Sequence, residues 1–387
     1  MKKLYIFDEA CPAAHYGIGT FIRQLTIALK ETDVQLHVVH LSSAKKQFEI
    51  ENGNTVTHYY LPCPPASRIA TEKINTVYMT SCLYALLSYI PDCSEQLFLL
   101  NYYVSPKCVN FMRTWWPRTS LIYVAHFFDP KIETETDEIT FLHEVDYIIC
   151  LSKVTLHSFI EKIGIAPAKI KLIYNGRENA YKSLTTSQRH TLRKSYYIRP
   201  DEIVLLFVGR IDMFKGISHL LTAFRKLVDW NDQCHLFIVG DGAWETYAPQ
   251  CKGTWGRISF TGKLKEEEVM ELYRIADIGF LLSYHEQCSY VGIEMMMQGI
   301  PTIVSAVAGL DEMFEEGVNT IQKLPVSSDR KKQEAECEAI YAAVKNALQD
   351  PARLKEIGEN ARNTYCRKYS LPVFRDEYLK LFKPVVK

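Results

Sequence analysis

Two cationic side chains flank a glycine-bounded turn at residues 208–216, where an apolar run ends and a helix is expected to begin. Gly209 and Gly216 permit positive φ or a close backbone approach. Arg210 offers a planar fork of donors and Lys215 a mobile point charge, and both suit phosphate oxygens. The pattern predicts a diphosphate site. The alternative is a surface arginine and lysine that only solvate a loop.

Two glutamates separated by seven residues follow a second apolar run. Glu286 is expected in the loop at the carboxyl end of a strand, and Glu294 about one turn inside the next helix, on its cleft-facing side. Carboxylates accept hydrogen bonds from hydroxyls, so the first suits a sugar ring and the second a ribose. Alternatively, Glu286 is solvated and Glu294 is a buried, satisfied acid. An unpaired carboxylate beside Met295, Met296 and Met297 is costly, which favours a ligand.

The helix expected between these glutamates begins near Ser289, with Tyr290, Val291 and Gly292 in its first turn. The first backbone amides of a helix have no partner within the helix, and the helix dipole favours an anion there. This helix start is therefore predicted to bind phosphate as well.

The elements that position these residues alternate between short apolar runs and helix-length segments, which predicts parallel α/β sheets. Apolar runs near residues 4–7, 97–100, 120–125 and 147–151 form a first series, and runs near 203–208, 235–239, 257–260, 278–281 and 301–304 form a second. The fold class predicted is α/β, with two doubly wound domains whose ligands lie at the carboxyl ends of the strands. We expect a first domain over 1–175, a linker over 176–200, a second domain over 201–366, and a last helix over 367–387 that packs back on the first domain. Ser152 and Thr155 are expected to cap a helix after the run at 147–151.

Charge and composition exclude several classes of protein. Lys plus Arg equals Asp plus Glu at 45 each, so no overall field favours nucleic acid or an anionic membrane. The eleven cysteines include no C-x-x-C pair, and the chain has no D-x-D sequence, so no metal site is expected. A secretory signal is not visible and no run reaches membrane-spanning length, which predicts a cytosolic protein. A peripheral contact at the cytosolic face of a membrane stays open, because Arg113, Trp115, Trp116 and Arg118 form either a membrane-touching group or half-buried packing.

Taken together, these motifs resemble the large retaining glycosyltransferase family that includes sucrose synthase and bacterial mannosyltransferases, and the likeness spans nearly the whole chain. The resemblance implies the GT-B fold, made of two Rossmann-like domains. It assigns Arg210 and Lys215 to the donor diphosphate, Glu286 to donor-sugar hydroxyls and Glu294 to the nucleotide ribose. The family commonly has Phe-Gly where this chain has Cys288-Ser289, which leaves the identity of the sugar open.

Further residues receive roles from the same resemblance. Lys263 and Leu264 face the nucleotide base through their backbone atoms, and Gly240 belongs to a glycine turn after the second strand of that domain. In the first domain, Gly17 and Gly19 open a helix through Lys30 and belong to a glycine-rich loop that approaches the donor phosphates and the acceptor; the alternative is a flexible turn. His126, which follows a strand, contacts the donor sugar or is structural. Asn101, Tyr102 and Tyr103 either line the acceptor side or join the core.

The activity implied is a retaining transfer from a nucleotide-diphosphate sugar, by front-face attack and without a metal or other cofactor. The acceptor is a glycan, a lipid-linked intermediate, a peptide or a small molecule. A glycan phosphorylase would need a pyridoxal lysine and a longer chain, and a nicotinamide dehydrogenase would need a full G-x-G-x-x-G after the first strand. A catalytically degenerate protein that only binds nucleotide sugars is the alternative that remains.

Overall fold

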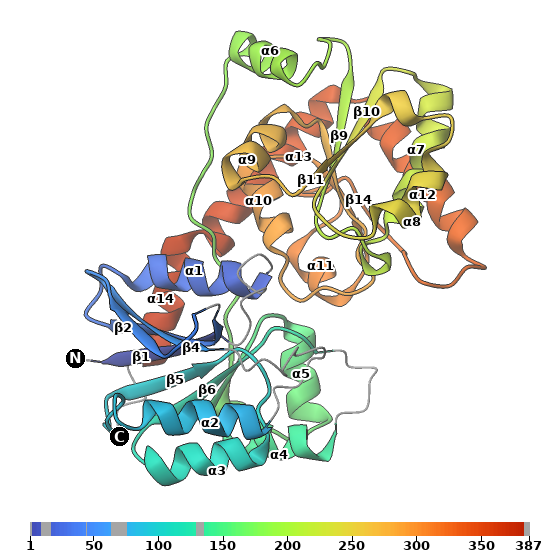
Figure 1. The fold of residues 1–387 in the computed structure, drawn as a ribbon. Helices are drawn as coiled ribbons and strands as arrows, with labels where there is room; N and C mark the ends of the chain where they lie inside the picture. The colour runs from blue at the N-terminus through green and yellow to red at the C-terminus, as the bar shows by residue number, and fades with distance from the viewer. Residues whose placement is uncertain (1, 9–16, 44, 63–75, 129–134, 383–387) are drawn as a thin grey trace. The chain divides into compact units, whose positions relative to one another are not determined.

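The computed structural model describes residues 2–8, 17–43, 45–62, 76–128 and 135–382. The chain divides into two compact units, of which unit 1 is Met1–Gly176 with Leu371–Lys387 and unit 2 is Arg177–Ser370. Each unit has its own sheet with helices on both faces (Figure 1). The predicted fold class is therefore confirmed.

Unit 1 has an eight-stranded sheet with the order β3-β4-β2-β1-β5-β6-β7-β8, and all neighbours are parallel except β3 and β4. Its strands are β1 (Lys3–Asp8), β2 (Gln35–Ser43), β3 (Glu49–Asn52), β4 (Val56–Pro62), β5 (Gln96–Leu100), β6 (Ser120–Ala125), β7 (Tyr147–Cys150) and β8 (Ile170–Leu172). Its helices are α1 (Gly17–Leu29), α2 (Thr76–Leu86), α3 (Pro106–Trp115), α4 (Thr136–Glu144), α5 (Lys153–Glu161) and α14 (Leu371–Phe382). The order of strands reverses between β1 and β5, and open α/β sheets commonly bind ligands at the carboxyl ends of the strands next to such a reversal.

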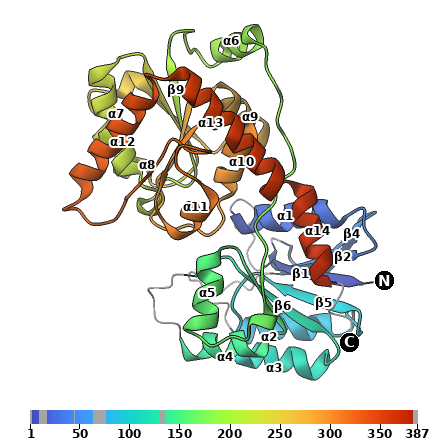
Figure 2. The same ribbon diagram turned by 180° about the vertical axis from the view of Figure 1, so that it is seen from behind.

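Unit 2 has a six-stranded, fully parallel sheet with the order β11-β10-β9-β12-β13-β14. Its strands are β9 (Ile203–Val208), β10 (Cys234–Val239), β11 (Ile258–Gly262), β12 (Ile278–Leu281), β13 (Thr302–Ser305) and β14 (Gln322–Leu324). Its helices are α6 (Thr186–Ser195), α7 (Ile217–Trp230), α8 (Trp244–Tyr247), α9 (Glu266–Ile275), α10 (Tyr290–Gln298), α11 (Ala308–Met313), α12 (Gln333–Ala347) and α13 (Pro351–Thr364). α7 packs against α12, and α10 packs against α9 and α13 (Figure 2). The reversal of strand order lies between β9 and β12.

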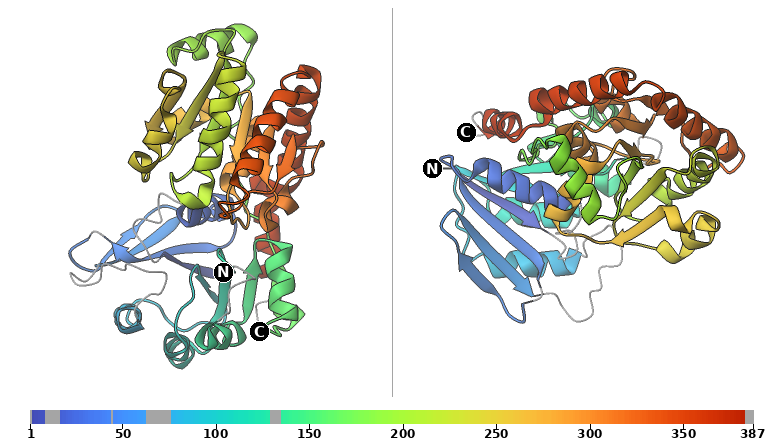
Figure 3. Two further views of the ribbon diagram at one scale, coloured as in Figure 1. Left: turned by 90° about the vertical axis from the view of Figure 1, so that its right-hand side faces the viewer. Right: turned by 90° about the horizontal axis from the view of Figure 1, so that it is seen from above.

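The strands next to these reversals are buried on both faces, which explains their continuous apolar sequences. β5 reads QLFLL and β12 reads IGFL, and every residue of both is buried. Parallel strands covered by helices on both sides lose the alternation of polar and apolar residues. Figure 3 gives two further views of this layering.

The last helix completes unit 1. α14 packs against α1, and its Phe374 and Tyr378 are 2% and 0% exposed. Both rings meet Phe21 of α1, at centroid distances of 6.1 and 6.3 Å. The segment starts at Leu371, four positions later than the sequence boundary of 367.

The segment expected to be a linker, 176–200, is instead part of unit 2 and contains a helix. Thr185 and Gln188 form a capping box at the start of α6. Arg189 and Arg193 on this helix both bind the carboxylate of Asp277, at 2.8 and 2.5 Å. Polar residues in this stretch suggested a loop, but they serve as a cap and as ion-pair partners, so this prediction is corrected.

Candidate functional site

The predicted diphosphate turn connects β9 to α7 and is held by its glycines. Gly209 has a φ of 150° and Gly216 a φ of 67°, both values that side chains disfavour. A Cβ atom on Gly216 would collide with the backbone oxygen of Leu282, just after β12. Asp212 caps the turn by accepting a 2.9 Å hydrogen bond from the Phe214 amide. The turn therefore lies directly against the end of the neighbouring strand.

Lys215 and Glu286 lie together at this point. The Lys215 ammonium forms an ion pair with Glu286, and Ser283 donates a 3.0 Å hydrogen bond to the same carboxylate oxygen. The two charged side chains are 23% and 16% exposed. The structure thus brings together one residue from each predicted motif, at the carboxyl ends of β9 and β12, where the order of strands reverses.

Arg210 has a different environment from Lys215. Its side chain is 54% exposed and its guanidinium lies 3.3 Å from a carboxylate oxygen of Asp212. An exposed ion pair of this kind contributes only about 0 to 1 kcal/mol to stability.

The start of α10 lies after β12, as expected, but one of its amides already has a partner. Ser289 caps the helix, and its hydroxyl oxygen accepts a 3.2 Å hydrogen bond from the Gly292 amide. The expectation that the Gly292 amide is open to phosphate is therefore wrong. Tyr290 and Val291 contribute the two amides that precede it in the first helical turn.

Gly309 is a residue of this site that sequence reasoning missed. Its amide donates a 3.2 Å hydrogen bond to the backbone oxygen of Glu286. A Cβ atom at this position would collide with the backbone oxygens of Glu286 and Gln287. Only a glycine lets α11 approach the loop that carries Glu286. The sequence signal was the tripeptide Val307-Ala308-Gly309 after an apolar strand.

The turns that follow β9, β10 and β11 lie side by side at the carboxyl edge of the sheet of unit 2. The Gly209 amide donates to Val239 at 2.9 Å, and the Gly240 amide donates to Gly262 at 3.0 Å. Gly240 has a φ of 141°, and a Cβ atom there would collide with the backbone oxygen of Gly209. These contacts fix the end of β11, after which Lys263 is exposed and Leu264 half-buried.

Glu294 has protein partners, contrary to the sequence argument. Arg177 donates from Nε to Oε1 at 3.0 Å, and the Tyr273 hydroxyl donates to Oε2 at 3.0 Å. Burial raises the pKa of Glu294, and the Arg177 guanidinium opposes that rise. The alternative of a buried, satisfied acid therefore describes this side chain, whose 14% exposure is all that a ligand could reach. The ribose contact stays a prediction. Sequence reasoning missed Arg177 because its partner is 117 residues away in the chain.

In unit 1, His126 and Asn101 follow β6 and β5 and are hydrogen-bonded to each other. The Asn101 amide donates from Nδ2 to the backbone oxygen of Phe7 at 2.8 Å, so its Oδ1 atom faces His126 Nε2 at 2.9 Å. Because Oδ1 can only accept, Nε2 carries the hydrogen and Nδ1 is left as an acceptor. Burial lowers the pKa of His126 to about 3, so the ring is neutral at pH 7.

Gly17 and Gly19 do not form a loop in the structure. Both lie in the first turn of α1, which begins at Gly17. The rest of the predicted glycine-rich loop, including Tyr16, lies outside the described residues. The prediction that these two glycines belong to a loop is therefore corrected.

The tryptophan and arginine group at the end of α3 is mainly structural. Trp116 is 1% exposed and donates its ring hydrogen to the Ile90 oxygen at 2.7 Å. Arg113 binds Asp146 at 2.9 Å, and Arg118 binds Asp92 at 2.8 Å. Packing is therefore the better interpretation, although Trp115 remains 48% exposed. No helix among the described residues is long and apolar enough to cross a membrane.

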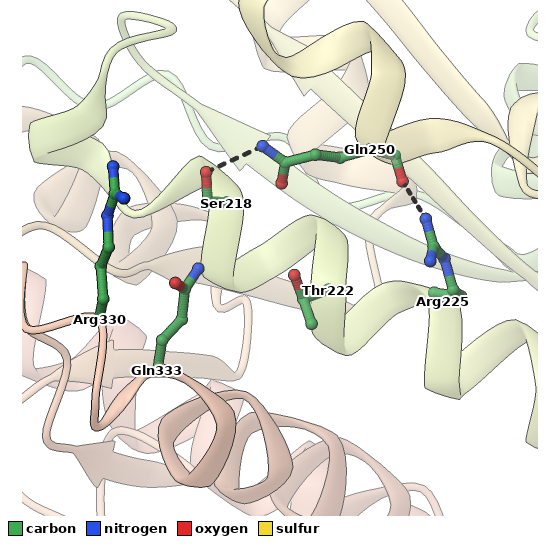
Figure 4. Close-up of a pocket in the computed structure, with 6 residues that line it drawn as sticks. All are labelled: Ser218, Thr222, Arg225, Gln250, Arg330 and Gln333. Carbon is green, nitrogen blue, oxygen red and sulfur yellow. Dashed lines mark hydrogen bonds between the residues drawn. The ribbon is translucent and has the colours of Figure 1, made fainter.

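A surface pocket of about 540 Å³ lies on unit 2 between α7 and the start of α12. Figure 4 shows its lining residues. The Gln250 side-chain amide donates a 3.1 Å hydrogen bond to the Ser218 hydroxyl, and the Gln250 backbone oxygen accepts a 2.7 Å hydrogen bond from Arg225. None of the predicted donor-binding residues lines it. Within the described residues, no group of three or more His, Cys, Asp or Glu side chains is placed to hold a metal ion.

Residues 188–364, which make up most of unit 2, match the model of a protein family described as "Glycosyl transferases group 1". A glycosyltransferase of Methanocaldococcus jannaschii is 27% identical over 262 residues, which cover 64% of this chain and 64% of that relative. The chain thus aligns with somewhat less than two thirds of this relative's length.

Two solved structures share the fold over the whole chain. A sucrose-phosphate synthase from Thermosynechococcus elongatus is 19% identical, with a TM-score of 0.81, and the match covers 100% of this chain and 99% of that one. The Anabaena protein HepE in complex with UDP is 17% identical, with a TM-score of 0.75, and the match covers 99% of this chain and 100% of that one. These likenesses identify the arrangement of elements in the two units as the GT-B fold.

Proposed function

We propose that the chain transfers a sugar from a nucleotide-diphosphate donor and that unit 2 holds this donor, because residues 188–364 match the model of the group 1 glycosyl transferases. The observation that carries the proposal is the ion pair of Lys215 and Glu286 at the reversal of strand order, where α/β sheets bind ligands. The UDP complex of HepE supports a nucleotide ligand for this fold.

Donor binding would exchange the partners of this ion pair. The diphosphate carries more negative charge than one carboxylate, so it competes for the Lys215 ammonium, with Arg210 as its second cation. Glu286 then accepts hydrogen bonds from sugar hydroxyls, which a carboxylate does with up to four lone pairs. The Tyr290 and Val291 amides at the start of α10 face the same anion.

We propose that stabilising the leaving group is the main catalytic effect. Cleavage of the bond between sugar and phosphate adds negative charge to the diphosphate and positive charge to the ring. An ion pair at about 4 Å is worth on the order of 4 kcal/mol at an effective dielectric constant of about 20, against roughly 0.3 to 2 kcal/mol for a helix terminus. Lys215 and Arg210 therefore contribute more than α10, and they take the place of a metal ion.

The proposed reaction retains the anomeric configuration by front-face attack. The departing phosphate oxygen takes the proton of the acceptor hydroxyl while that hydroxyl oxygen bonds to the anomeric carbon. In unit 1, Nδ1 of His126 is proposed to accept a hydrogen bond from a sugar hydroxyl, because Asn101 occupies Nε2. A neutral imidazole suits this role, since an imidazolium carries a hydrogen on both ring nitrogens and cannot accept.

A thermal-shift screen against UDP-, GDP- and ADP-sugars tests the proposal, followed by an assay of donor turnover. A ligand at 100 times its dissociation constant raises the unfolding free energy by about 2.7 kcal/mol, which gives a clear shift. We expect one class of nucleotide sugar to raise the melting temperature and to be consumed. If none of them shifts it, the donor site is wrong. Binding without turnover against any acceptor would favour the catalytically degenerate alternative.

A further inference from the structure

Arg177 occupies a special position in the chain, because it is the first residue of unit 2. Its backbone amide donates to the Tyr369 oxygen at 2.9 Å, and its own oxygen accepts from the Tyr365 hydroxyl at 2.9 Å. Its backbone also forms an isolated parallel β-bridge with Ser370, the last residue of unit 2. The entry and exit of the chain in this unit are thus joined at Arg177.

The side chain of Arg177 is 2% exposed and binds two acids. Its Nε donates to Glu294 at 3.0 Å, and its Nη2 forms an ion pair with Glu266 at the start of α9. A guanidinium has donors in a fixed plane, so two carboxylates bound to it are fixed in direction as well. Tyr273 holds the other oxygen of Glu294.

The Glu294 carboxylate keeps unused acceptor capacity in this arrangement. Each oxygen receives one hydrogen bond, from Arg177 and from Tyr273, and an ionised carboxylate has about four lone-pair sites. A cis diol supplies two donors side by side, which matches the two sites left. The carboxylate is 14% exposed, so part of it is open to such a ligand.

We propose that Arg177 is a positioning residue, which holds Glu294 in the orientation that accepts the 2′- and 3′-hydroxyls of the donor ribose. This inference rests on the proposed function, and it adds a buried arginine that touches neither the sugar nor the phosphates. Arg177 acts through Glu294 alone, so it should affect ligands that contain ribose and leave ribose-free phosphates unaffected.

The charge of Arg177 supports this role. Burial of Glu294 favours its protonated form, in which one oxygen becomes a donor and loses acceptor capacity. The guanidinium opposes this effect at the nearer oxygen. Loss of Arg177 would therefore leave Glu294 both less oriented and less ionised, and both changes weaken the ribose contact.

The test compares UDP, GDP and ADP with inorganic pyrophosphate, by isothermal titration calorimetry. Arg177→Met keeps the length of the side chain and removes its donors. For the nucleotide that the wild type binds, we expect roughly 10- to 100-fold weaker affinity, the range for a hydrogen bond to a charged group. Pyrophosphate, which lacks ribose, should bind within about two-fold of the wild type, since it uses only Lys215, Arg210 and the α10 amides.

Arg193→Met is the matched control. Arg193 is also a buried arginine of unit 2, 4% exposed and paired with Asp277 at 2.5 Å, but it does not contact Glu294. We expect it to lower stability without changing the ratio of nucleotide to pyrophosphate affinity. In a double-mutant cycle, Glu294→Gln should add little to Arg177→Met, because the two residues act as one unit.

Several results would overturn the inference. Wild-type nucleotide affinity in Arg177→Met, or equal weakening of nucleotide and pyrophosphate, would leave Arg177 a purely structural role. If Arg177→Met does not fold, Arg177→Lys decides, because one ammonium cannot replace the planar fork. We expect roughly 3- to 10-fold weaker nucleotide binding in that variant, and unchanged binding contradicts the inference. A wild type that binds none of the three nucleotides refutes the proposed function itself.

Discussion

The ammonium of Lys215 and the carboxylate of Glu286 form an ion pair although 71 residues separate them in the chain. The pair joins the turn after β9 to the loop after β12, so neither residue presents a bare charge before a ligand arrives. A donor must replace this ion pair with its own contacts to Lys215 and Glu286. Substitution of either residue should therefore affect donor binding or turnover.

Replacement of Lys215 by alanine removes the better fixed of the two cations. We expect turnover to fall by roughly 10²- to 10³-fold, the effect of losing one preorganised donor to a developing negative charge. The measurement is donor consumption by the purified variant, with circular dichroism to verify the fold. Lys252→Ala, an exposed lysine elsewhere in unit 2, should leave turnover unchanged. Near-normal turnover in Lys215→Ala would refute the leaving-group role.

Replacement of Glu286 by glutamine should separate binding of the nucleotide from catalysis. The amide no longer competes for the Lys215 ammonium, so UDP without a sugar should bind at least as tightly as in the wild type. Turnover of the nucleotide sugar should fall by roughly 10²-fold, because the contact to the sugar hydroxyls is weaker. Calorimetry with UDP and a turnover assay measure the two effects. Weaker UDP binding together with normal turnover would contradict this assignment.

Removal of divalent metal ions should leave activity unchanged. The sequence contains no D-x-D motif, and Arg210 with Lys215 is proposed to neutralise the diphosphate. The test is donor turnover in EDTA after dialysis, compared with turnover in added Mg²⁺ or Mn²⁺. Loss of activity in EDTA that Mn²⁺ restores would require a metal in the mechanism.

Stability should depend on pH through His126. Burial lowers the pKa of this ring to about 3, whereas an unfolded histidine titrates near about 6.5. Between these values the unfolded chain holds a proton that the folded chain lacks, so the unfolding free energy rises with pH across the window. The part of the unfolding free energy that depends on a neutral His126 is fully present above about pH 6.5. It is lost as the pH falls, and the unfolding free energy then decreases by up to about 1.4 kcal/mol per pH unit.

Urea unfolding at several pH values between about 7 and 5 measures this slope. In His126→Gln, the slope of the unfolding free energy against pH should decrease by the equivalent of about one bound proton. His143→Gln, at an exposed position, is the control. Equal slopes for the wild type and His126→Gln would show that His126 does not make this contribution.

Local sequence predicted the buried strands and several caps well. The runs at Ile203–Val208 and Ile278–Leu281 coincide with β9 and β12, because a strand covered on both faces is apolar throughout. Ser152 caps α5 as expected, with its hydroxyl oxygen accepting from the Thr155 amide at 3.3 Å. Such features depend on residues that are neighbours in the chain.

Features that depend on distant partners were not predictable in the same way. Nothing in the local sequence distinguishes Arg177 from other polar residues, because its partners Glu294, Glu266 and Tyr365 lie far from it in the chain. The sequence argument for Glu294 failed for the same reason, because it counted only the methionines next to it. The local sequence predicts a linker in the polar stretch that contains α6, because the anchor of this helix, Asp277, lies more than 80 residues away.

The return of α14 to unit 1 has a consequence for biosynthesis. A ribosome releases residues 177–370 before it releases the helix that covers Phe21. Unit 1, whose synthesis begins first, therefore becomes complete only after unit 2. Until then, an apolar face of the nascent chain stays open to water or to a chaperone. A stop codon shortly before Leu371 would therefore damage the amino-terminal half of the protein more than the half that it directly follows.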